Sequence, residues 1–193
     1  VGETSVVICN GKPVRLRVKK VIYAYNKPIG QVCTSKEADK DSIFRYVEFP
    51  ERVNYVGRLD KDSTGLLLLT NDGDLANEIQ RSRNNHEKEY HVRVNTDITE
   101  DFIKKMSEGV EILDTVTKPC KVKKTGTRNF SIILTQGLNR QIRRMCDALH
   151  VRVVHLKRVR IMNVRIGNLR PGEFRTLTRD EERELRSLVQ KRS

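Results

Sequence analysis

Two spacings of apolar residues recur along the chain. Alternation at every second position, as in Tyr90, Val92 and Val94, is typical of a strand with one buried face. Spacing of three or four, as in Ile142, Met145 and Leu149, is typical of an amphipathic helix. Read together with turn residues, these patterns predict strands at 21–27, 31–34, 53–56, 66–70, 89–95, 151–164 and 174–177, with two or three more between 110 and 136. They predict helices over 99–109, over 139–149, from the turn at 71–74 to about 81, and from 178 onward.

Strands and helices are intermixed, and hairpin-type turns outnumber regular strand–helix–strand crossovers. This order predicts an α+β fold with a central mixed, largely antiparallel sheet flanked by helices. Residues 1–20 differ from the rest: a short Val/Ile run and an Asn10-Gly11 turn precede a basic segment, as in a strand pair or a linker. We therefore expect one main domain over 21–193.

Charge is distributed unevenly. The net charge is +13, and residues 118–170 hold 14 Lys or Arg against one acid, Asp147. The remaining residues carry 24 basic and 24 acidic side chains, so one stretch accounts for the whole excess. A solvated surface usually mixes both signs, whereas a one-sided stretch is the footprint of a polyanion-binding face. The chain is therefore expected to bind nucleic acid.

Other classes of protein are disfavoured. No apolar run approaches the roughly 20 residues that span a bilayer, and no secretory signal opens the chain. The four cysteines, Cys9, Cys33, Cys120 and Cys146, form no C-x-x-C pair, and neither they nor the histidines have zinc-ligand spacing. We expect reduced thiols, no metal, no membrane partner, a cytoplasmic location and a monomer.

Three segments carry candidate chemistry. In GRLDKDSTGLLLLT (57–70), Asp60 lies in a loop between apolar strands, where rigid folds often place catalytic groups. Taken alone, Asp60 and Asp62 suit a metal-binding pair, a glycosidase-like carboxylate pair or an ordinary loop. In HEKEYHV (86–92), Tyr90 suits sheet packing or stacking on an extruded base. In LTQGLNRQIRRM (134–145), arginines crowd the first turns of a helix, where phosphate or carboxylate binds well.

Together the three segments resemble the pseudouridine synthases that modify ribosomal RNA at single uridines in the small or large subunit. GVEILDTVTKPCKVKK (109–124) and RVRIMNV (158–164) occur in the same order along the chain as in that family. The sequence of these segments is most similar to the large-subunit branch designated F. The resemblance implies the family's catalytic fold with an active-site cleft across the sheet. It also implies isomerisation of a uridine in 23S rRNA and, in some members, in a tRNA anticodon loop. Residues 1–20 would then be the tail or linker of an N-terminal RNA-binding module.

The resemblance assigns roles residue by residue. Asp60 matches the catalytic aspartate, Tyr90 the active-site tyrosine, and Arg143 the arginine paired with that aspartate. Arg58 matches the loop arginine associated with base extrusion. The basic residues expected to contact substrate RNA, beside Arg58, are Arg140, Lys118, Lys121, Lys123, Lys124, Arg158 and Arg160.

The implied reaction needs no cofactor because it involves neither redox change nor net hydrolysis. A single ionised carboxylate can act as nucleophile at the ribose or as base at its carbon-2, and the residues alone do not choose between these roles. Two other functions remain open at the level of the sequence. The charge alone also suits a non-enzymatic RNA-binding or ribosome-assembly protein, and Asp60 with Asp62 also suits a metal-dependent nuclease.

Overall fold

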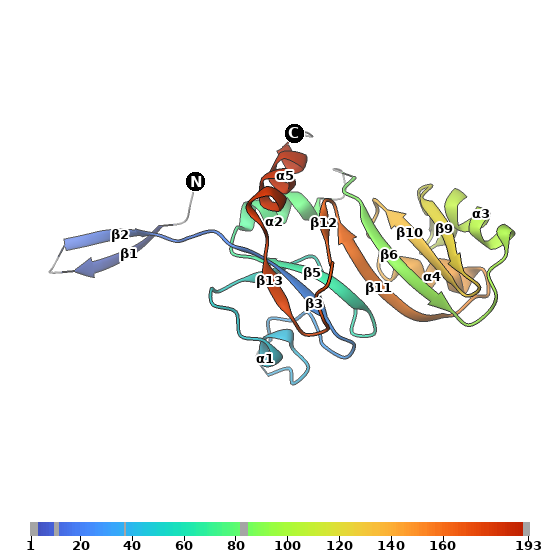
Figure 1. Ribbon diagram of the computed structural model, residues 1–193, viewed down its shortest axis with the longest axis horizontal. Coiled ribbons are helices and arrows are strands. Elements are labelled where there is room, and N and C mark those ends of the chain that lie inside the picture. The colour runs from blue at the N-terminus through green and yellow to red at the C-terminus, as the bar shows by residue number, and fades with distance from the viewer. Residues whose placement is uncertain (1–3, 10–11, 37, 82–84, 191–193) are drawn as a thin grey trace.

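A nine-stranded sheet forms the centre of the computed structural model, which describes residues 4–9, 12–36, 38–81 and 85–190 (Figure 1). The path through the sheet runs β13 (Phe174–Thr176), β3 (Ile22–Lys27), β5 (Thr64–Thr70), β11 (Val153–Ile161), β6 (Lys88–Val94), β10 (Asn129–Leu134) and β9 (Lys121–Gly126). Two more strands pair off this path, β4 (Asn54–Val56) on β5 and β12 (Val164–Arg165) on β11. Every pair is antiparallel except β5 with β11, which confirms the expected mixed, largely antiparallel sheet.

Five helices and two small hairpins complete the described chain. The helices are α1 (Ile43–Tyr46), α2 (Gly73–Gln80), α3 (Glu100–Glu108), α4 (Gln141–Ala148) and α5 (Arg179–Gln190). The hairpins pair β7 (Glu111–Ile112) with β8 (Thr115–Val116), and β1 (Thr4–Cys9) with β2 (Lys12–Arg17). The β1–β2 hairpin extends to one side of the main sheet (Figure 1), and its Asn10-Gly11 turn lies outside the described residues. None of the described helices is long and apolar enough to cross a bilayer.

The half of the sheet built on β3 and β5 is buried on both faces. Leu66 and Leu68 pack into a cluster with α2 and α5, while Leu67 and Leu69 pack against Tyr23 and the segment around α1. A strand covered on both sides has no solvent-facing positions, which explains the unbroken Leu66–Leu69 run. This half of the molecule is therefore a three-layer structure.

The other half, built on β11, β6, β10 and β9, is covered on one face. Val92, Phe130, Ile132 and Leu156 pack against residues of α3 and α4 in a separate cluster. The neighbouring positions along the same strands point to the opposite face, which no helix residue of that cluster reaches. This half of the molecule is therefore a two-layer structure, with the sheet as one layer and helices α3 and α4 as the other.

The two halves meet at the single parallel pair of the sheet. Only two residue pairs, Lys157 with Thr64 and Arg158 with Gly65, connect β11 to β5. Gly65 has φ +111°, and a Cβ there would lie 2.1 Å from the Arg158 carbonyl oxygen. Glycine is therefore required where the halves join.

Several expected elements differ in detail. Residues 31–34 form no strand, and their one bridge pairs Val32 with Ser42. The expected strand 151–164 is two strands, β11 and β12, because the chain turns at Met162, whose φ is +53°. Segment 110–136 holds four strands, and Leu149 is only partly buried, whereas Cys146 is fully buried. Cys33, Cys120 and Cys146 are free thiols, and the side chain of Cys9 lies outside the described part.

Candidate active site

A cleft of about 700 Å³ lies where the two halves meet. Its walls are the loop 57–63 before β5, the segment 134–143 that ends β10 and opens α4, and the strands β6 and β11 between them. Asp60, Tyr90 and Arg143, which are separated in the sequence, all line it. The sheet therefore brings the three expected catalytic residues into one cavity.

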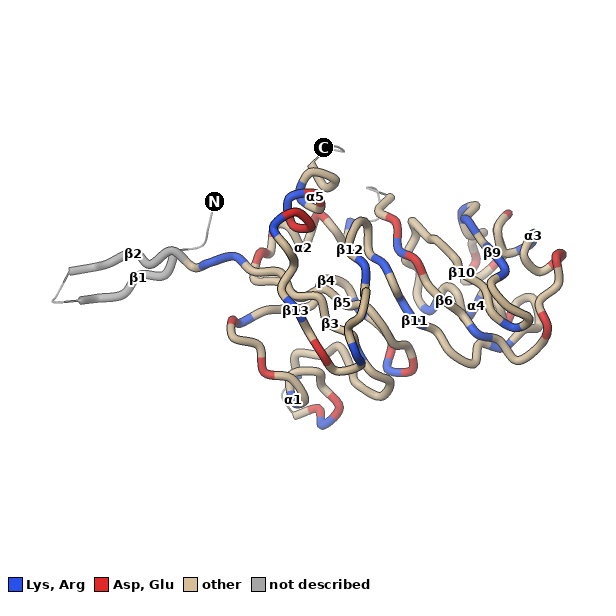
Figure 2. Tube along the Cα trace, viewed as in Figure 1, with Lys and Arg blue, Asp and Glu red and all other residues tan. Residues whose placement is uncertain are grey.

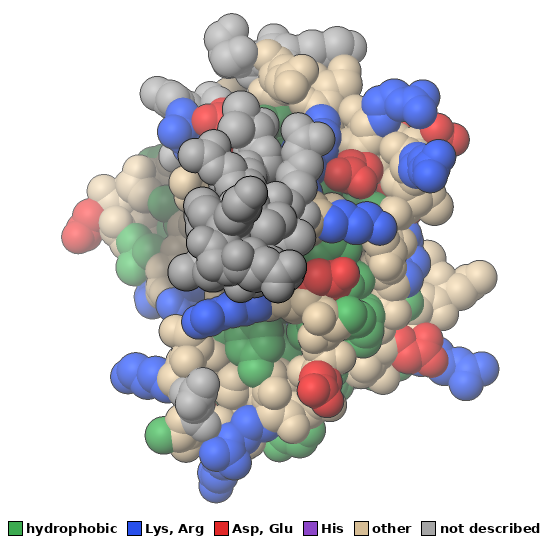
Figure 3. All heavy atoms as spheres, turned by 90° about the vertical axis from the view of Figure 1, so that its left-hand side faces the viewer, with side chains coloured by type: hydrophobic (Ala, Val, Ile, Leu, Met, Phe, Trp, Pro, Cys, Tyr) green, Lys and Arg blue, Asp and Glu red, His purple; other side chains and the backbone are tan. Residues whose placement is uncertain are grey.

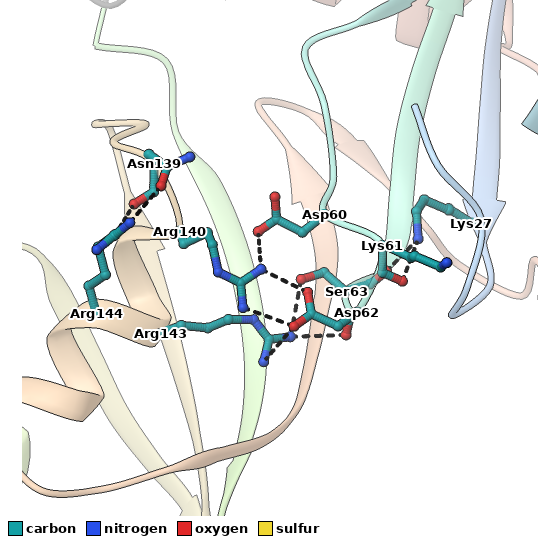
Figure 4. A network of polar contacts seen from close by, with 9 residues as sticks. All are labelled: Lys27, Asp60, Lys61, Asp62, Ser63, Asn139, Arg140, Arg143 and Arg144. Atoms are coloured by element: carbon teal, nitrogen blue, oxygen red, sulfur yellow. Dashed lines mark hydrogen bonds and ion pairs between the residues drawn. The ribbon is translucent and has the colours of Figure 1, made fainter. Parts of the chain in front are cut away.

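Asp60 lies at the mouth of this cleft with its side chain 42% exposed. The Ser63 amide donates to the Asp60 carbonyl at 3.0 Å, which closes a tight turn around the residue. One guanidinium nitrogen of Arg140, Nη1, lies 3.3 Å from Asp60 Oδ2 (Figure 4). The carboxylate thus has one cationic neighbour and one side open to a ligand.

Asp62 holds the arginines more firmly than Asp60 does. Arg140 donates two parallel hydrogen bonds to its carboxylate, at 3.0 and 2.9 Å, and Arg143 Nη1 lies 3.6 Å from it (Figure 4). The hydrogen bond from Arg140 keeps the pKa of Asp62 below its ordinary value, against the opposing effect of burial. Asp62 is therefore an anion that orients two arginines, and it shares the Arg140 guanidinium with Asp60.

Arg140 has the conformation that this role requires. It precedes the first residue of α4 with φ +48° and ψ +39°, in the left-handed region that non-glycine residues seldom occupy. This conformation turns the guanidinium from the helix start toward loop 57–63. Strained residues of this kind concentrate at functional sites.

Arg143, in the first turn of α4, contacts the same loop. Its Nη2 donates to the Asp62 carbonyl at 2.9 Å and to Ser63 Oγ at 3.2 Å, and only 13% of the side chain is exposed. The resemblance implied that Arg143 pairs with Asp60. In the structure that partner is Arg140, whereas Arg143 fixes the backbone and the carboxylate of Asp62. Arg143 therefore positions the loop.

Tyr90 is half-buried in the cleft on β6. It pairs across the sheet with Arg158 on β11 and with Ile132 on β10. Among the described residues its hydroxyl makes no hydrogen bond and is not sealed from solvent. Both the ring and the hydroxyl are thus available to a ligand.

Two lysines that the sequence analysis did not single out lie buried or half-buried beside the site. Lys27 is fully buried, and its Nζ donates to the carbonyl oxygens of Ser63 at 2.7 Å and Pro28 at 3.0 Å. Burial lowers the pKa of Lys27, and it lowers that of Lys88, beside Arg158 on the cleft floor, to about 8. These residues come from strands far apart in the sequence, so only the sheet register could have revealed them.

The expected RNA contacts fall into distinct groups. Arg58 is exposed and lines the cleft, and Lys118 is exposed close to the segment 134–143, where its amide bonds Gln136. Lys124 shares the face of α3 and donates to the Ile98 carbonyl at 3.0 Å. Lys121 and Lys123 point to the opposite face of the sheet from the cleft.

Two members of that set are held by contacts within the protein. Arg158 is 3% exposed, with its Nε donating to the Leu66 carbonyl at 2.7 Å. Arg160 is engaged by Glu87 at 3.2 Å and Glu89 at 3.4 Å. Both guanidinium groups are therefore engaged by the protein, and Arg158 also lines the cleft.

The family model described as RNA pseudouridylate synthase matches residues 21–148, a span that includes Asp60, Tyr90 and Arg143. The chain belongs to this family. The resemblance drawn from the three motifs is thereby confirmed, and so is the α+β pseudouridine synthase fold. A solved structure described as a pseudouridylate synthase superposes with a TM-score of 0.81 at 30% identity, covering 91% of this chain and 76% of the other.

Named relatives of this pseudouridylate synthase family act on RNA. The chain is 50% identical over 191 residues to the dual-specificity RNA pseudouridine synthase RluF of Escherichia coli strain K12, covering 98% of this chain and 66% of the relative. It is 30% identical over 149 residues to the ribosomal small subunit pseudouridine synthase A of Yersinia pestis, covering 75% and 63%. The chain thus spans about two thirds of the length of these relatives.

Proposed function

We propose that the chain isomerises a specific uridine to pseudouridine in 23S rRNA, and that a tRNA anticodon loop is a second substrate. The observation that carries this proposal is the half-exposed Asp60 carboxylate at the mouth of a cleft that it shares with Tyr90 and two arginines. The 50% identity to RluF, whose name describes a dual-specificity RNA pseudouridine synthase, supports the choice of substrates. The enzyme would act as a monomer in the cytoplasm.

The reaction breaks the bond between ribose carbon-1 and uracil nitrogen-1, and the electron pair leaves with the ring. Asp60 starts this step as nucleophile at the sugar or as base at carbon-2. The ring then turns and carbon-5 bonds to ribose carbon-1, which releases the Asp60 carboxylate or, in the base route, accompanies return of the proton to carbon-2. The proton on carbon-5 is lost to a base, and nitrogen-1 takes up a proton. Product and substrate have the same atoms, so no oxidant, reductant or water is consumed.

Each residue of the site has a part in this sequence. Arg140 Nη1 lies 3.3 Å from Asp60 Oδ2 and holds the carboxylate in place at the mouth of the cleft. Tyr90 can stack on the detached uracil while it turns. Arg58, on the rim, can occupy the space that the extruded nucleotide leaves, since a base inside a stack is beyond the reach of Asp60.

We further propose that residues 1–20 belong to the tail or linker of an RNA-binding module. The family model begins to match at residue 21, and β1 and β2 form a sheet of their own. Both observations support a boundary at this point.

The test is one pair of reactions with Asp60→Asn as the comparison. The protein is incubated with large-subunit rRNA and with tRNA, with and without EDTA, and pseudouridines and strand breaks are mapped. New pseudouridine without breaks, unaffected by EDTA, is the expected result. Asp60→Asn keeps the size of the side chain and removes its charge, so turnover should be lost while RNA affinity stays within about threefold.

Other outcomes identify the competing functions. RNA binding with no change in any uridine would indicate a non-enzymatic binding protein. Strand scission that stops with EDTA would indicate a nuclease. Substantial pseudouridine formation by the Asp60→Asn protein would overturn the role given to Asp60.

A further inference from the structure

One face of the sheet is uncovered on the side away from the cleft. Its side chains come from alternate positions of β11, β6, β10 and β9, the half that α3 and α4 cover on the other side. We call it the open face. Its basic residues are His91, Arg93, Lys121, Lys123, His155, Lys157 and Arg160, the last of which is paired with Glu87 and Glu89.

The sheet register places these residues in rows. Lys157 pairs with His91, His91 with Ser131, and Ser131 with Lys123, so one row crosses four strands. At roughly 4.8 Å between strands, its two lysines are about 14 Å apart at the backbone. A second row aligns His155, Arg93 and Asn129. The cations therefore form a grid and not a single line.

Four of these charges are not neutralised by the protein. Within the described part of the chain, Arg93, Lys121, Lys123 and Lys157 make no side-chain hydrogen bond or ion pair. The acid on the same face, Glu89, is 3.4 Å from Arg160 and 3.8 Å from His91. Elsewhere the signs are mixed: the end of the molecule that faces the viewer in Figure 3 shows Lys and Arg interspersed with Asp and Glu. Lys and Arg recur along β11, β6 and β9 in Figure 2.

Protection of a sheet edge explains only part of this pattern. Edge strands often carry Lys to prevent pairing with another chain, and β9 is an edge, so Lys121 and Lys123 fit that explanation. Arg93 and Lys157 lie on β6 and β11, which have neighbours on both sides and need no such protection. A polyanionic partner accounts for all four.

We propose that the open face is a second RNA-binding surface, which contacts the backbone phosphates of a helical RNA segment outside the cleft. The inference rests on the proposed function, because it assumes that the substrate is a folded RNA. Apart from Glu89 and Ile133, the described open face offers Lys, Arg, His, Ser and Asn and no Phe, Tyr or Trp, so it lacks the large rings on which unpaired bases stack best. Its contacts hold the duplex backbone and read no sequence.

Two double variants with the same change in charge test this proposal. Arg93→Gln with Lys123→Gln removes one Arg and one Lys from the open face. Lys104→Gln with Arg179→Gln removes one of each from α3 and α5, where both side chains are exposed. The probe is an RNA duplex of about 20 base pairs and arbitrary sequence, with affinity measured by fluorescence anisotropy over a range of salt. Thermal unfolding of both variants checks that they are folded.

For the open-face variant we expect weaker binding and a plot of log affinity against log salt that is flatter by about 1.4–1.8, because two phosphate contacts are lost. The control variant should keep the wild-type slope. An equal slope in the two variants would overturn the proposal. Poly-glutamate is measured in the same way as a second polyanion. If the open-face variant loses affinity for poly-glutamate alone and not for the duplex, the partner is an acidic protein and the proposal is also overturned. Pseudouridine formation by the wild-type protein is assayed separately, so failure of the proposed function is visible on its own.

Discussion

At the scale of single residues, the Asp62 carboxylate determines where both arginines of the site lie. It receives two hydrogen bonds from Arg140 and lies 3.6 Å from Arg143. A bidentate pair of this kind fixes direction as well as distance, which Lys or an amide does not reproduce. The position of Arg140 beside Asp60 therefore depends on a neighbour that does not itself have to touch substrate.

Asp62→Asn should consequently lower turnover, by about tenfold, because misplaced catalytic groups are costly even when none is removed. Single-turnover pseudouridine formation at saturating RNA measures the effect. Asp97→Asn is the matched control, since Asp97 also pairs with an arginine, Arg128, but on the exposed surface. Equal rates for wild type and Asp62→Asn would show that Arg140 needs no such anchor.

Tyr90→Phe separates the two uses of the tyrosine. The ring remains for stacking, while a hydroxyl that has no partner among the described residues is removed. We expect RNA affinity to be retained and the single-turnover rate to fall by roughly 10²-fold, the lower range for loss of a general acid or base. A wild-type rate in this variant would confine Tyr90 to stacking.

At the scale of elements, Gly65 is the point where β5 approaches β11 most closely. Gly65→Ala would place a methyl group 2.1 Å from the Arg158 carbonyl oxygen, in a backbone conformation with φ +111°. We expect the free energy of unfolding to drop by about 3 kcal/mol or more, as measured in urea. Gly73→Ala, where nothing lies within 4 Å of the added Cβ, should change it by less than about 1 kcal/mol. Comparable losses in both variants would contradict the close approach.

The spacing of apolar residues predicted most helices and strands, because the burial of one face determines which of the two forms. Strand β6 alternates as expected, and α3 begins after Thr99, whose hydroxyl accepts a hydrogen bond from the Phe102 amide. The segment 31–34 was predicted wrongly as a strand, since its Gln and Val pack beside α1 with no neighbouring strand to pair with. Positions such as Met162, where the backbone turns with positive φ, carry no signal in their side chains.

The site residues divide in the same way, into those that a local motif marks and those that only the fold brings to the site. Asp60, Tyr90 and Arg143 were predicted through three motifs, and all three line the cleft. Lys27 and Lys88 were not, because a lysine in a strand looks the same in sequence whether it is exposed or buried. The basic stretch predicted an RNA surface as one unit, whereas the register of β9 sends Lys123 and Lys124 to opposite faces.

At the scale of the whole molecule, Lys88 links the cleft to stability. Burial and Arg158 lower its pKa from 10.5 to about 8, so at pH 7 the folded protein holds a cation that the environment disfavours. Between pH 8 and 10.5 the unfolded chain binds the proton that the folded chain has lost, so stability rises with pH in this window.

Lys88→Met should therefore stabilise the protein by on the order of 2 kcal/mol at pH 7, and by less as the pH rises toward 10. Urea unfolding of both proteins at pH 7 and 9.5 gives this difference at each pH. A difference that does not change with pH would show that packing, and not charge, is responsible.

The contact between the two halves has a mechanical consequence. Only two residue pairs join β5 to β11, and the ion pairs from Asp60 and Asp62 to Arg140 cross the same junction above them. Arg140 therefore ties loop 57–63 of one half to α4 of the other. A ribose that engages Asp60 must compete with Arg140, whereas the two hydrogen bonds from Arg140 to Asp62 leave this connection in place.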